Sequence, residues 1–453
     1  QVPINTAYRG AFLEHQVRTT SPSAAIITAE FAERLLESKE ACTSIRRIFL
    51  VDEDADAAKA LRAAGFEIEP FGALLTAEPV SLPAPGPTDL SAIFFTSGTT
   101  GLSKGVMMPQ AHLCFFADQV VSLTRLTDRD THMSVGPLFH GNAQFMAAYP
   151  AFIAGARYVM RERFSASNWG RWIHESNVTV TNFLGVMMDW VWKQPPSPVD
   201  SDNVLRCLFS APTASSIMEG FRKRFGVKEF VEVFGLTETS PMILTPYGVP
   251  RPAGAAGAAS TWFDIRLVNP DTDEEVPVGE VGELVLRAKH PWTTSQGYYG
   301  MPERTVEMLR NCWLHTGDGL RRDEAGWYYF VDRLKDAIRT RGENISSYEV
   351  EQAVLGHEAV AECAAVGVPA DSEAGEDEVM VCIVLAPGAR LSPEEAWAWC
   401  DRRLPKFAVP RYLAFLDTLP ATPSGKIRKA QLRELKPSQR LDRGPGGRRS
   451  KQK

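Results

Sequence analysis

The sequence predicts an α/β protein, in which a large domain of several subdomains with parallel sheets precedes a small α+β domain. Short apolar segments alternate with amphipathic segments from the start of the chain, which is typical of parallel strands covered by helices. This pattern changes after Asp332, where about 100 residues read as a separate small domain. A length of 453 residues also exceeds one ordinary core.

The first elements are two strand–helix pairs. Strands are expected at residues 24–27 and 45–51, and each precedes a helical segment, at 29–38 and 54–64. A proline-rich linker at 83–87 then leads into the next strand. The mixed pattern continues to about residue 330 and becomes strand-rich from Phe263 onward.

The C-terminal part carries clear helix-start signals. Ser346 and Glu349 fit a capping box, and Ser392 precedes a proline at the first helical position and a glutamate at the third. Between these helices, the apolar run at 379–385 predicts a strand. We therefore expect a large domain over 1–332, a small domain over 333–436 and a basic, disordered tail over 437–453.

The composition is that of an ordinary globular protein, with 44% apolar and 23% charged residues. The net charge of −6 gives no reason to expect nucleic acid as a partner. Seven cysteines without CxxC spacing favour reduced thiols and a cytoplasmic location over a disulfide framework. No apolar run approaches the ~18 residues of a transmembrane helix. The oligomeric state is left open.

Residues 96–105 are the most informative segment. They follow an apolar run at 92–95 that we expect to be a buried strand. Glycines allow the backbone to approach a ligand, and hydroxyls and an ammonium supply donors, so this composition suits polyphosphate. The spacing is not that of a Walker A loop, because Lys104 is followed by glycine. The expected nucleotide-binding residues here are Thr96, Ser97, Gly98, Thr99, Thr100, Gly101 and Lys104.

Four further motifs follow, at residues 234–238 (FGLTE), 315–318 (HTGD), 332–336 (DRLKD) and 423–428 (PSGKIR). Together and in this order the five motifs resemble the adenylate-forming superfamily, which includes acyl-CoA synthetases, adenylation modules of peptide synthetases and beetle luciferase. The resemblance extends from residue 2 to about residue 430. It places residue 2 well inside the family's large domain, so the chain is expected to be N-terminally incomplete.

The resemblance implies an acid–thiol ligase that uses ATP, Mg²⁺ and coenzyme A. A carboxylic acid and ATP give acyl-AMP and diphosphate, and the CoA thiol then gives acyl-CoA and AMP. It also implies domain alternation, in which Lys335 is the hinge of a mobile C-terminal domain. The small domain would then present Lys426 for adenylation and Gly342 for passage of the pantetheine arm.

The resemblance also assigns residues around the nucleotide. Glu238 would hold Mg²⁺, since hard cations prefer oxygen ligands, and Thr237 would bond the α-phosphate. Asp318 would accept from the ribose hydroxyls, with Arg333 assisting, and His140 would lie between the ATP and acyl sites. Adenine would lie against Phe234, Gly235, Ser210, Ala211 and Pro212.

The acyl group is less well defined. Residues 137–143 contain no acid to pair with an α-ammonium group, and no carrier domain follows. These points favour a free-standing ligase similar to the crotonobetaine/carnitine-type or fatty-acid CoA ligases, hence a place in fatty acid metabolism. The tryptophans at 169, 172, 190 and 192 would suit a quaternary ammonium, although core packing is the more ordinary use. Two alternatives stay open: adenylation for a carrier protein, and a catalytically inactive truncated homologue.

Overall fold

The structure is a computed structural model that describes residues 1–96, 103–211, 217–333, 338–340, 343–345, 347–369, 377–420, 427 and 429–444. Within helices and strands, the side chains of a few of these residues are not described. The chain divides into two compact units. Unit 1 comprises Gln1, Pro85–Phe94 and Val106–Lys335, and unit 2 comprises Val2–Ala84, Phe95–Gly105 and Asp336–Lys453.

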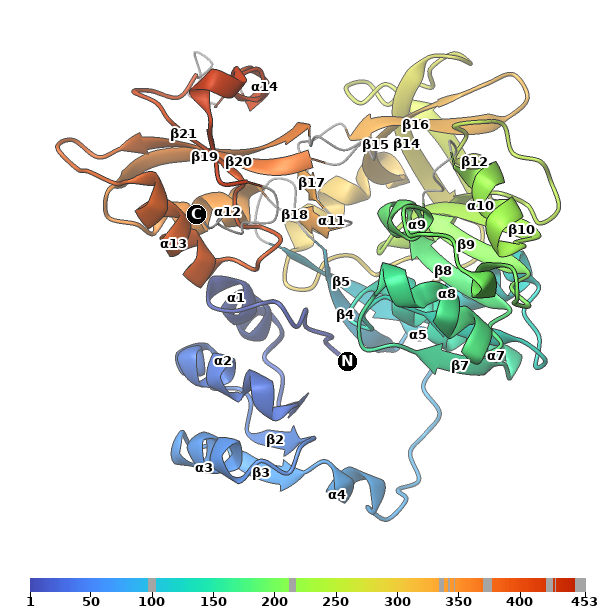
Figure 1. The fold of residues 1–453 in the computed structure, drawn as a ribbon, viewed down its shortest axis with the longest axis horizontal. Coiled ribbons are helices and arrows are strands. Elements are labelled where there is room, and N and C mark those ends of the chain that lie inside the picture. The colour runs from blue at the N-terminus through green and yellow to red at the C-terminus, as the bar shows by residue number, and fades with distance from the viewer. Residues whose placement is uncertain are drawn as a thin grey trace. The chain divides into compact units, whose positions relative to one another are not determined.

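Unit 1 is built on an eleven-stranded sheet in the order β13-β14-β15-β16-β12-β11-β10-β9-β8-β6-β7 (Figure 1). The strands are β6 Thr131–Ser134, β7 Arg157–Met160, β8 Val180–Leu184, β9 Cys207–Ala211, β10 Glu229–Leu236, β11 Thr239–Leu244, β12 Gly257–Ala259, β13 Phe263–Val268, β14 Val281–Ala288, β15 Leu314–Arg322 and β16 Trp327–Arg333. Strands β4 (Leu90–Thr96) and β5 (Lys104–Pro109) form a separate two-stranded sheet.

The direction of pairing changes at β10. In this sheet order, neighbouring strands from β7 to β10 pair in parallel, whereas neighbouring strands from β10 to β13 pair antiparallel. The parallel half needs crossover helices, and the chain supplies helices between these strands. The antiparallel half corresponds to the strand-rich stretch expected from Phe263 onward.

The helices of unit 1 cover both faces of the parallel half. Alternate residues of β9 face opposite ways, because side chains alternate along a strand. Leu208 packs in a core cluster with α8, α9 and α10, whereas Phe209 packs in another with α5. The helices are α5 Gln110–Thr124, α6 Gly141–Ala143, α7 Tyr149–Ala154, α8 Ala166–Glu175, α9 Gly185–Trp192, α10 Met218–Phe225 and α11 Pro302–Met308.

Unit 2 contains two sheets of three or more strands. The parallel sheet β1-β2-β3 confirms the expected strand–helix alternation at the start of the chain, and the other sheet has the order β19-β20-β21-β22. The strands are β1 Ala24–Ile27, β2 Arg47–Leu50, β3 Glu67–Pro70, β17 Ile338–Thr340, β18 Glu343–Ile345, β19 Val360–Pro369, β20 Asp377–Leu385, β21 Tyr412–Phe415 and β22 Leu441–Asp442. The helices are α1 Ala11–Thr20, α2 Ala32–Glu37, α3 Ala55–Ala63, α4 Gly72–Leu75, α12 Ser347–Leu355, α13 Pro393–Arg403 and α14 Lys429–Arg433.

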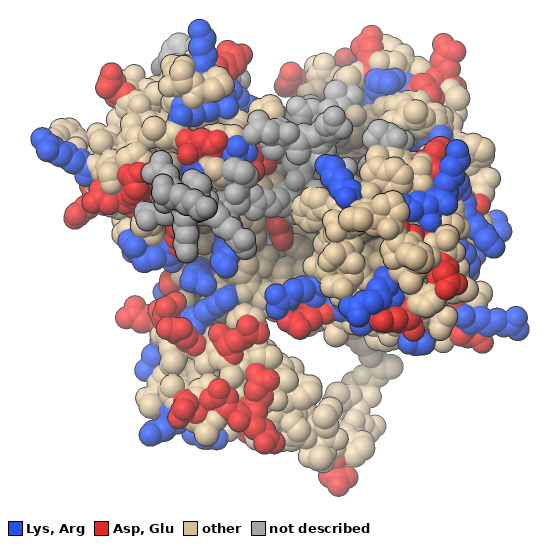
Figure 2. Space-filling model, in the orientation of Figure 1, with Lys and Arg blue, Asp and Glu red and all other residues tan. Residues whose placement is uncertain are grey.

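Helix α13 begins as its sequence predicts. Ser392 accepts from the backbone of Glu395, whose carboxylate reaches back to the N–H of Ser392. The surface over α2 and α3 carries mainly acidic side chains on the face in Figure 2. Among the residues of these two helices, Glu33, Glu37 and Asp56 are exposed.

Part of the segment that was expected to be a disordered tail is ordered, namely residues 437–443. Residues 437–439 form a short 3₁₀ helix, and β22 pairs antiparallel with β21 through Leu441 and Leu413. Arg443 also forms an ion pair with Asp401 at 2.6 Å. A basic composition predicted disorder here, but an unpaired edge of the sheet offers two residues of this segment a hydrogen-bonding partner.

Candidate functional site

Several expected site residues follow the carboxyl ends of the parallel strands. Ser210 and Ala211 end β9, Phe234 and Gly235 lie near the end of β10, and His140 comes after β6. Ser210 is fully buried and is in register with Phe183 of β8 and Glu232 of β10. Carboxyl ends of parallel strands meet at one edge of a sheet, which is where ligands bind in open α/β folds. These five residues thus follow or lie near strand ends at one edge of the parallel half.

Gly235 occupies a very close approach between β10 and β11. A Cβ atom at this position would lie 2.2 Å from Ser240 Oγ and 2.6 Å from Ser240 Cβ. The strand register shifts between Phe234 and Leu236, so the connection is tight and irregular. The half-buried ring of Phe234 lies 5.8 Å from that of Phe330. Thr237 and Glu238 form the turn from β10, which pairs in parallel with β9, to β11, which pairs antiparallel with β10.

Glu238 is held by its backbone and by its side chain. Its side chain is buried, and its carbonyl oxygen accepts from the N–H of Ser295 at 2.8 Å. The hydroxyl of Tyr298 donates to its Oε1 at 2.7 Å. Burial, followed by the charge of Glu238, raises the pKa of Tyr298 well above its ordinary value, so the phenol keeps its proton. Sequence reasoning missed Tyr298, because nothing local links it to a residue sixty positions earlier.

The Glu238 carboxylate fits a magnesium ion by its chemistry. Carboxylate oxygens are hard ligands, and Tyr298 engages only Oε1. Among the residues that the structure describes, none donates to Oε2, and no group of three or more His, Cys, Asp or Glu could hold a metal. One carboxylate oxygen is therefore available. Protein sites of this kind complete the coordination of Mg²⁺ with phosphate and water oxygens.

Asp318 lies in the antiparallel half, on β15. Its backbone pairs with that of Arg333 on β16, so two residues that the motifs predicted separately are cross-strand partners. Asp318 is 2% exposed, and its N–H donates to Thr316 Oγ1 at 3.1 Å. The Thr316 hydroxyl donates in turn to the carbonyl of Leu284 at 2.7 Å. These contacts fix the strand segment that carries the carboxylate.

A buried charge cluster holds the turn before Asp318. Glu283 accepts from the N–H of Gly317 at 2.9 Å, contacts His315 Nδ1 at 2.9 Å and pairs with Arg310 at 3.2 Å. Burial alone would raise the pKa of Glu283. The hydrogen bonds from His315 and Gly317, with the charges of His315 and Arg310, bring it below its ordinary value. Gly317 adopts a φ of 73°, which favours glycine. This cluster joins β14 to the segment from Arg310 to Gly317, and the sequence did not predict the contact of Glu283 with the HTGD motif.

His140 is half-buried and immediately precedes α6. Nearby side chains are neutral amides, which sequence reasoning did not single out. Asn182 on β8 donates to Asn142 Oδ1 at 2.5 Å, and Gln144 donates to the carbonyl of Leu138 at 3.2 Å. This region therefore presents amide groups and no carboxylate in the 137–143 segment.

The tryptophan-rich segment is used mainly for packing. Trp169 is fully buried among Phe183, Phe221 and Phe225. The rings of Trp172 and Trp192 lie under the guanidinium groups of Arg161 and Arg224, at 5.1 and 5.8 Å. Trp190 is the most exposed of the four, at 37%. Packing is thus the role of three of these rings.

In unit 2, the described ends of the phosphate-loop motif are Thr96, which ends β4, and Lys104, which begins β5. Ser103, just before Lys104, is held from both sides. Its N–H donates to Glu349 Oε1 at 2.5 Å, and its carbonyl accepts from His15 Nε2 at 2.7 Å. Several predicted residues lie outside the described residues, namely Ser97, Gly98, Thr99, Thr100, Gly101, Pro212, Lys335, Gly342 and Lys426.

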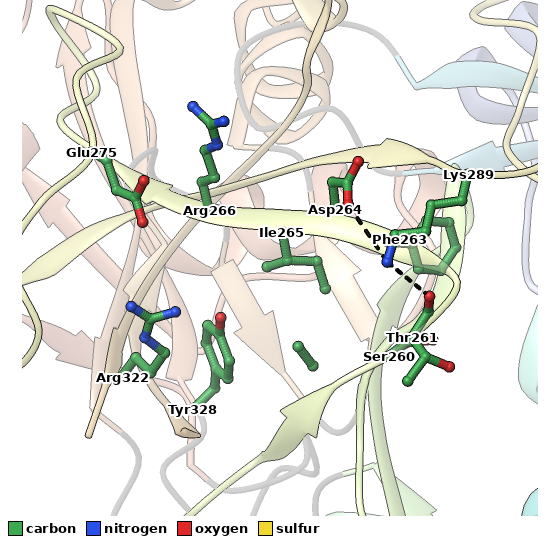
Figure 3. Close-up of a pocket in the computed structure, with 11 residues that line it drawn as sticks. Ser260, Thr261, Phe263, Asp264, Ile265, Arg266, Glu275, Lys289, Arg322 and Tyr328 are labelled. Atoms are coloured by element: carbon green, nitrogen blue, oxygen red, sulfur yellow. Dashed lines mark hydrogen bonds and ion pairs between the residues drawn. The ribbon is translucent and has the colours of Figure 1, made fainter. Parts of the chain in front are cut away.

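A surface pocket of about 470 Å³ lies elsewhere in unit 1, on the antiparallel half (Figure 3). Ile265 points into it from β13, whereas the neighbouring Asp264 and Arg266 point to the other side of that strand. Lys289, which also lines the pocket, pairs with Asp264 Oδ1 at 3.5 Å and donates to the Thr261 carbonyl at 3.1 Å. None of the predicted site residues that the structure describes lines this pocket. It is therefore separate from the candidate nucleotide site.

Comparison with known proteins gives consistent relatives. A family model described as AMP-binding enzyme matches residues 1–299, and one described as AMP-binding enzyme C-terminal domain matches residues 349–426. Feruloyl-CoA synthase from an Amycolatopsis species is 34% identical over 387 residues, which are 84% of this chain and 77% of the relative. Crotonobetaine/carnitine–CoA ligase from Salmonella typhi is 31% identical over 440 residues, which are 95% of this chain and 83% of the relative.

Solved structures share the fold. The amide bond synthetase McbA from Marinactinospora thermotolerans has a TM-score of 0.78 at 23% identity, over 95% of this chain and 84% of that chain. An o-succinylbenzoate CoA synthetase from Bacillus subtilis has a TM-score of 0.75 at 22% identity, over 97% of this chain and 88% of that chain. The fold class predicted from the sequence, a large α/β domain with a smaller C-terminal domain, is confirmed.

Proposed function

The chain belongs to the AMP-binding enzyme family, and on that premise we propose how its own residues carry out acyl-CoA ligation. The resemblance to adenylate-forming enzymes is confirmed, and the relatives are acid–thiol ligases that use ATP, Mg²⁺ and coenzyme A. The observation that carries the proposal is the turn after β10, where a buried carboxylate stands at the change from parallel to antiparallel pairing.

The first half-reaction activates the acid. A carboxylate oxygen attacks the α-phosphorus of ATP, the bond to the β-phosphate breaks, and diphosphate leaves. Phe234 and Gly235, with Ser210, Ala211 and Pro212, would hold adenine, and Thr237 would bond the α-phosphate. Glu238 would hold Mg²⁺, which when bound would neutralise part of the charge of the phosphates.

The remaining roles complete the nucleotide site. Asp318 would accept from the ribose hydroxyls, and its backbone partner Arg333 would assist. Lys426 would stabilise the charge that builds between carboxylate and α-phosphate. In the phosphate-loop motif, Thr96 to Gly101 and Lys104 would bind the β- and γ-phosphates.

The second half-reaction forms the thioester. The CoA thiol loses its proton, its sulfur attacks the acyl carbon, and the bond to AMP breaks. Rotation at Lys335 would replace Lys426 by the segment around Gly342, and His140 would separate the ATP and acyl sites. The proposed large domain over 1–332 and small domain over 333–436 belong to this hypothesis.

The proposed substrate is a carboxylic acid without an α-ammonium group. The amides of Asn142, Gln144 and Asn182 offer neutral hydrogen bonds beside His140, and the 137–143 segment has no carboxylate. Because three of the four tryptophans are used in packing, the structure lends little support to an aromatic cage for a quaternary ammonium group. This favours an acid that carries no cationic group, such as the feruloyl acid named for the relative, over a betaine. All seven cysteines are free thiols, which supports a cytoplasmic location. No helix among the described residues is long and apolar enough to span a membrane.

The test separates the two half-reactions. Carboxylate-dependent ATP–diphosphate exchange reports adenylation, and CoA consumption from supplied acyl-AMP reports thioester formation. Lys426→Ala should lower exchange by about 10²–10³-fold while sparing the second step, because a charge partner of only the first transition state is lost. Lys406→Ala, which removes an exposed lysine of the same unit, is the matched control.

Equal losses in both steps would contradict the role of Lys426. Absence of exchange with every acid in a panel of hydroxycinnamates, fatty acids and crotonobetaine would instead favour the inactive-homologue alternative. Preference for crotonobetaine over ferulate within an active panel would refute the proposal that the substrate carries no cationic group.

A further inference from the structure

The segment from Ser295 to Tyr298 holds Glu238 at two points. The Ser295 N–H binds the Glu238 carbonyl at 2.8 Å, which fixes the backbone of the turn. The Tyr298 hydroxyl binds Oε1 at 2.7 Å, which fixes the carboxylate. Because both its backbone carbonyl and its Oε1 are hydrogen-bonded, the buried Glu238 side chain can adopt few rotamers. The orientation of its second carboxylate oxygen, Oε2, is thereby restricted.

The same segment is paired with β5, the strand that begins directly after the phosphate-loop motif. Gln296 N–H donates to the carbonyl of Met107 at 2.9 Å, and Met107 N–H donates back to the carbonyl of Gly297 at 2.9 Å. Val106 and Tyr298 form an antiparallel bridge. The segment therefore connects the turn after β10 with a strand more than 100 residues away in sequence.

Tyr298 itself is anchored by α11. Its N–H donates to Thr305 Oγ1 at 2.9 Å, and that hydroxyl donates to the carbonyl of Met301 at 3.1 Å. Gly297 has a φ of 101°, and a Cβ there would lie 2.3 Å from Thr305 Cγ2. Only glycine allows this approach. Tyr298 is 5% exposed and packs in the main core of unit 1, so its hydroxyl is aimed at Glu238 by a rigid surrounding.

We infer that residues 295–298 act as a strut between β5 and the turn after β10, with Tyr298 as a positioning residue for the metal-binding carboxylate of Glu238. The inference rests on the proposed role of Glu238. Hydrogen-bond partners behind a metal ligand orient it, and their loss weakens metal binding by about 10–100-fold. Tyr298 touches neither metal nor substrate in this scheme. It acts through Glu238.

The test measures metal binding directly rather than turnover. Mn²⁺, a paramagnetic substitute for Mg²⁺, is titrated into the protein with α,β-methylene-ATP, and free Mn²⁺ is followed by electron paramagnetic resonance. Tyr298→Phe should weaken Mn²⁺ binding by about 10-fold or more, since it removes one hydroxyl and keeps the ring. Tyr299→Phe is the matched control, because it removes a hydroxyl from the adjacent half-buried tyrosine, whereas the hydroxyl that donates to Glu238 belongs to Tyr298.

A double-mutant cycle separates the inference from its premise. If the inference holds, Glu238→Gln weakens Mn²⁺ binding, and adding Tyr298→Phe to it causes little further loss. Normal binding by Tyr298→Phe, with weakened binding by Glu238→Gln, would overturn the strut alone. Normal binding by Glu238→Gln would overturn the metal assignment itself and the inference with it.

A second variant guards against a folding defect in Tyr298→Phe. Thr305→Val removes the acceptor of the Tyr298 N–H at nearly constant volume and leaves the phenol in place. It should weaken Mn²⁺ binding in the same direction by a smaller factor, with the melting temperature measured without nucleotide as the check on folding. Unchanged Mn²⁺ binding by a folded Thr305→Val protein would contradict the anchoring of the strut through α11.

Discussion

Replacing Glu349 by Gln is expected to remove a pH dependence from the stability of unit 2. The Glu349 carboxyl on α12 is 8% exposed and accepts from the backbone N–H of Ser103 at 2.5 Å. Burial raises its pKa to about 7, although the hydrogen bonds from Ser103 oppose the rise. Burial, followed by the charges of Glu349 and Glu343, raises the pKa of Tyr8, so that the phenol stays neutral. His15 lies on the far side of Ser103, at its carbonyl.

The sign and size of this pH dependence follow from the protonation of Glu349 in the folded and in the unfolded chain. The pKa of Glu349 is higher in the folded chain than its ordinary value of 4.5, so the folded state binds more protons between these pH values. The stabilisation is complete below pH 4.5 and is lost as the pH rises through 7. The difference between the two pKa values corresponds to roughly 3 kcal/mol in the free energy of unfolding, of which we expect about 1–3 kcal/mol to be measurable. Gln stays neutral and keeps a carbonyl oxygen for the Ser103 N–H.

Hydrogen exchange of the α12 amides measures this effect. Comparing wild type and Glu349→Gln at the same pH cancels the intrinsic pH dependence of exchange. At pH 8 the variant amides should exchange about 10-fold or more slowly, because each 1.4 kcal/mol of opening free energy changes the rate tenfold. At pH 5 the two proteins should differ little. Glu358→Gln, at an exposed position just after α12, is the matched control. Parallel pH profiles for wild type and Glu349→Gln would refute the reasoning.

Two further predictions concern unit 1. Gly235→Ala should lower adenylation by about 10-fold or more, since a Cβ 2.2 Å from Ser240 Oγ must displace the turn that carries Glu238. Gly72→Ala, where nothing lies within 4 Å, is the control, and equal rates for the two variants would contradict the steric argument. His112 and His132 are fully buried, and burial lowers the pKa of each to about 3, so the unfolded chain binds more protons below pH 6.5. The free energy of unfolding should therefore fall by about 2 kcal/mol per histidine at pH 5. Urea titrations of His112→Gln should show that its free energy of unfolding falls less steeply than that of wild type as the pH is lowered. An unchanged dependence of this free energy on pH would argue against a neutral buried imidazole.

The sequence predicted those features that depend on local pattern. The Ser392 capping box and the strands β1 and β2 appear where their hydroxyl, proline and apolar residues indicated. The motif residues Phe234 to Glu238 were expected to surround a nucleotide. They lie at a strand end and turn, where a glycine is needed for close approach.

The features that sequence reasoning missed all join distant segments. Tyr298 meets Glu238 across 60 residues, and Ser103 meets Glu349 across 246 residues. Neither contact has a periodicity or a spacing that would reveal it, because a side-chain hydrogen bond depends on tertiary placement. The pairing of β22 with β21 is similar, since a two-residue strand has no pattern of its own and takes its structure from its partner.

The change of strand direction at β10 explains why the candidate residues of unit 1 come from such different motifs. In a purely parallel sheet, every site residue would follow a strand end at one edge. Here β10 also pairs antiparallel with β11, and the antiparallel half brings the backbones of Asp318 and Arg333 into register on β15 and β16. The tight turn with Glu238 lies where these two halves join. A displacement of that turn would thus move the carboxylate that the Tyr298 hydroxyl holds. For this reason, substitutions at Gly235 and Tyr298 should affect metal and nucleotide binding more than overall stability.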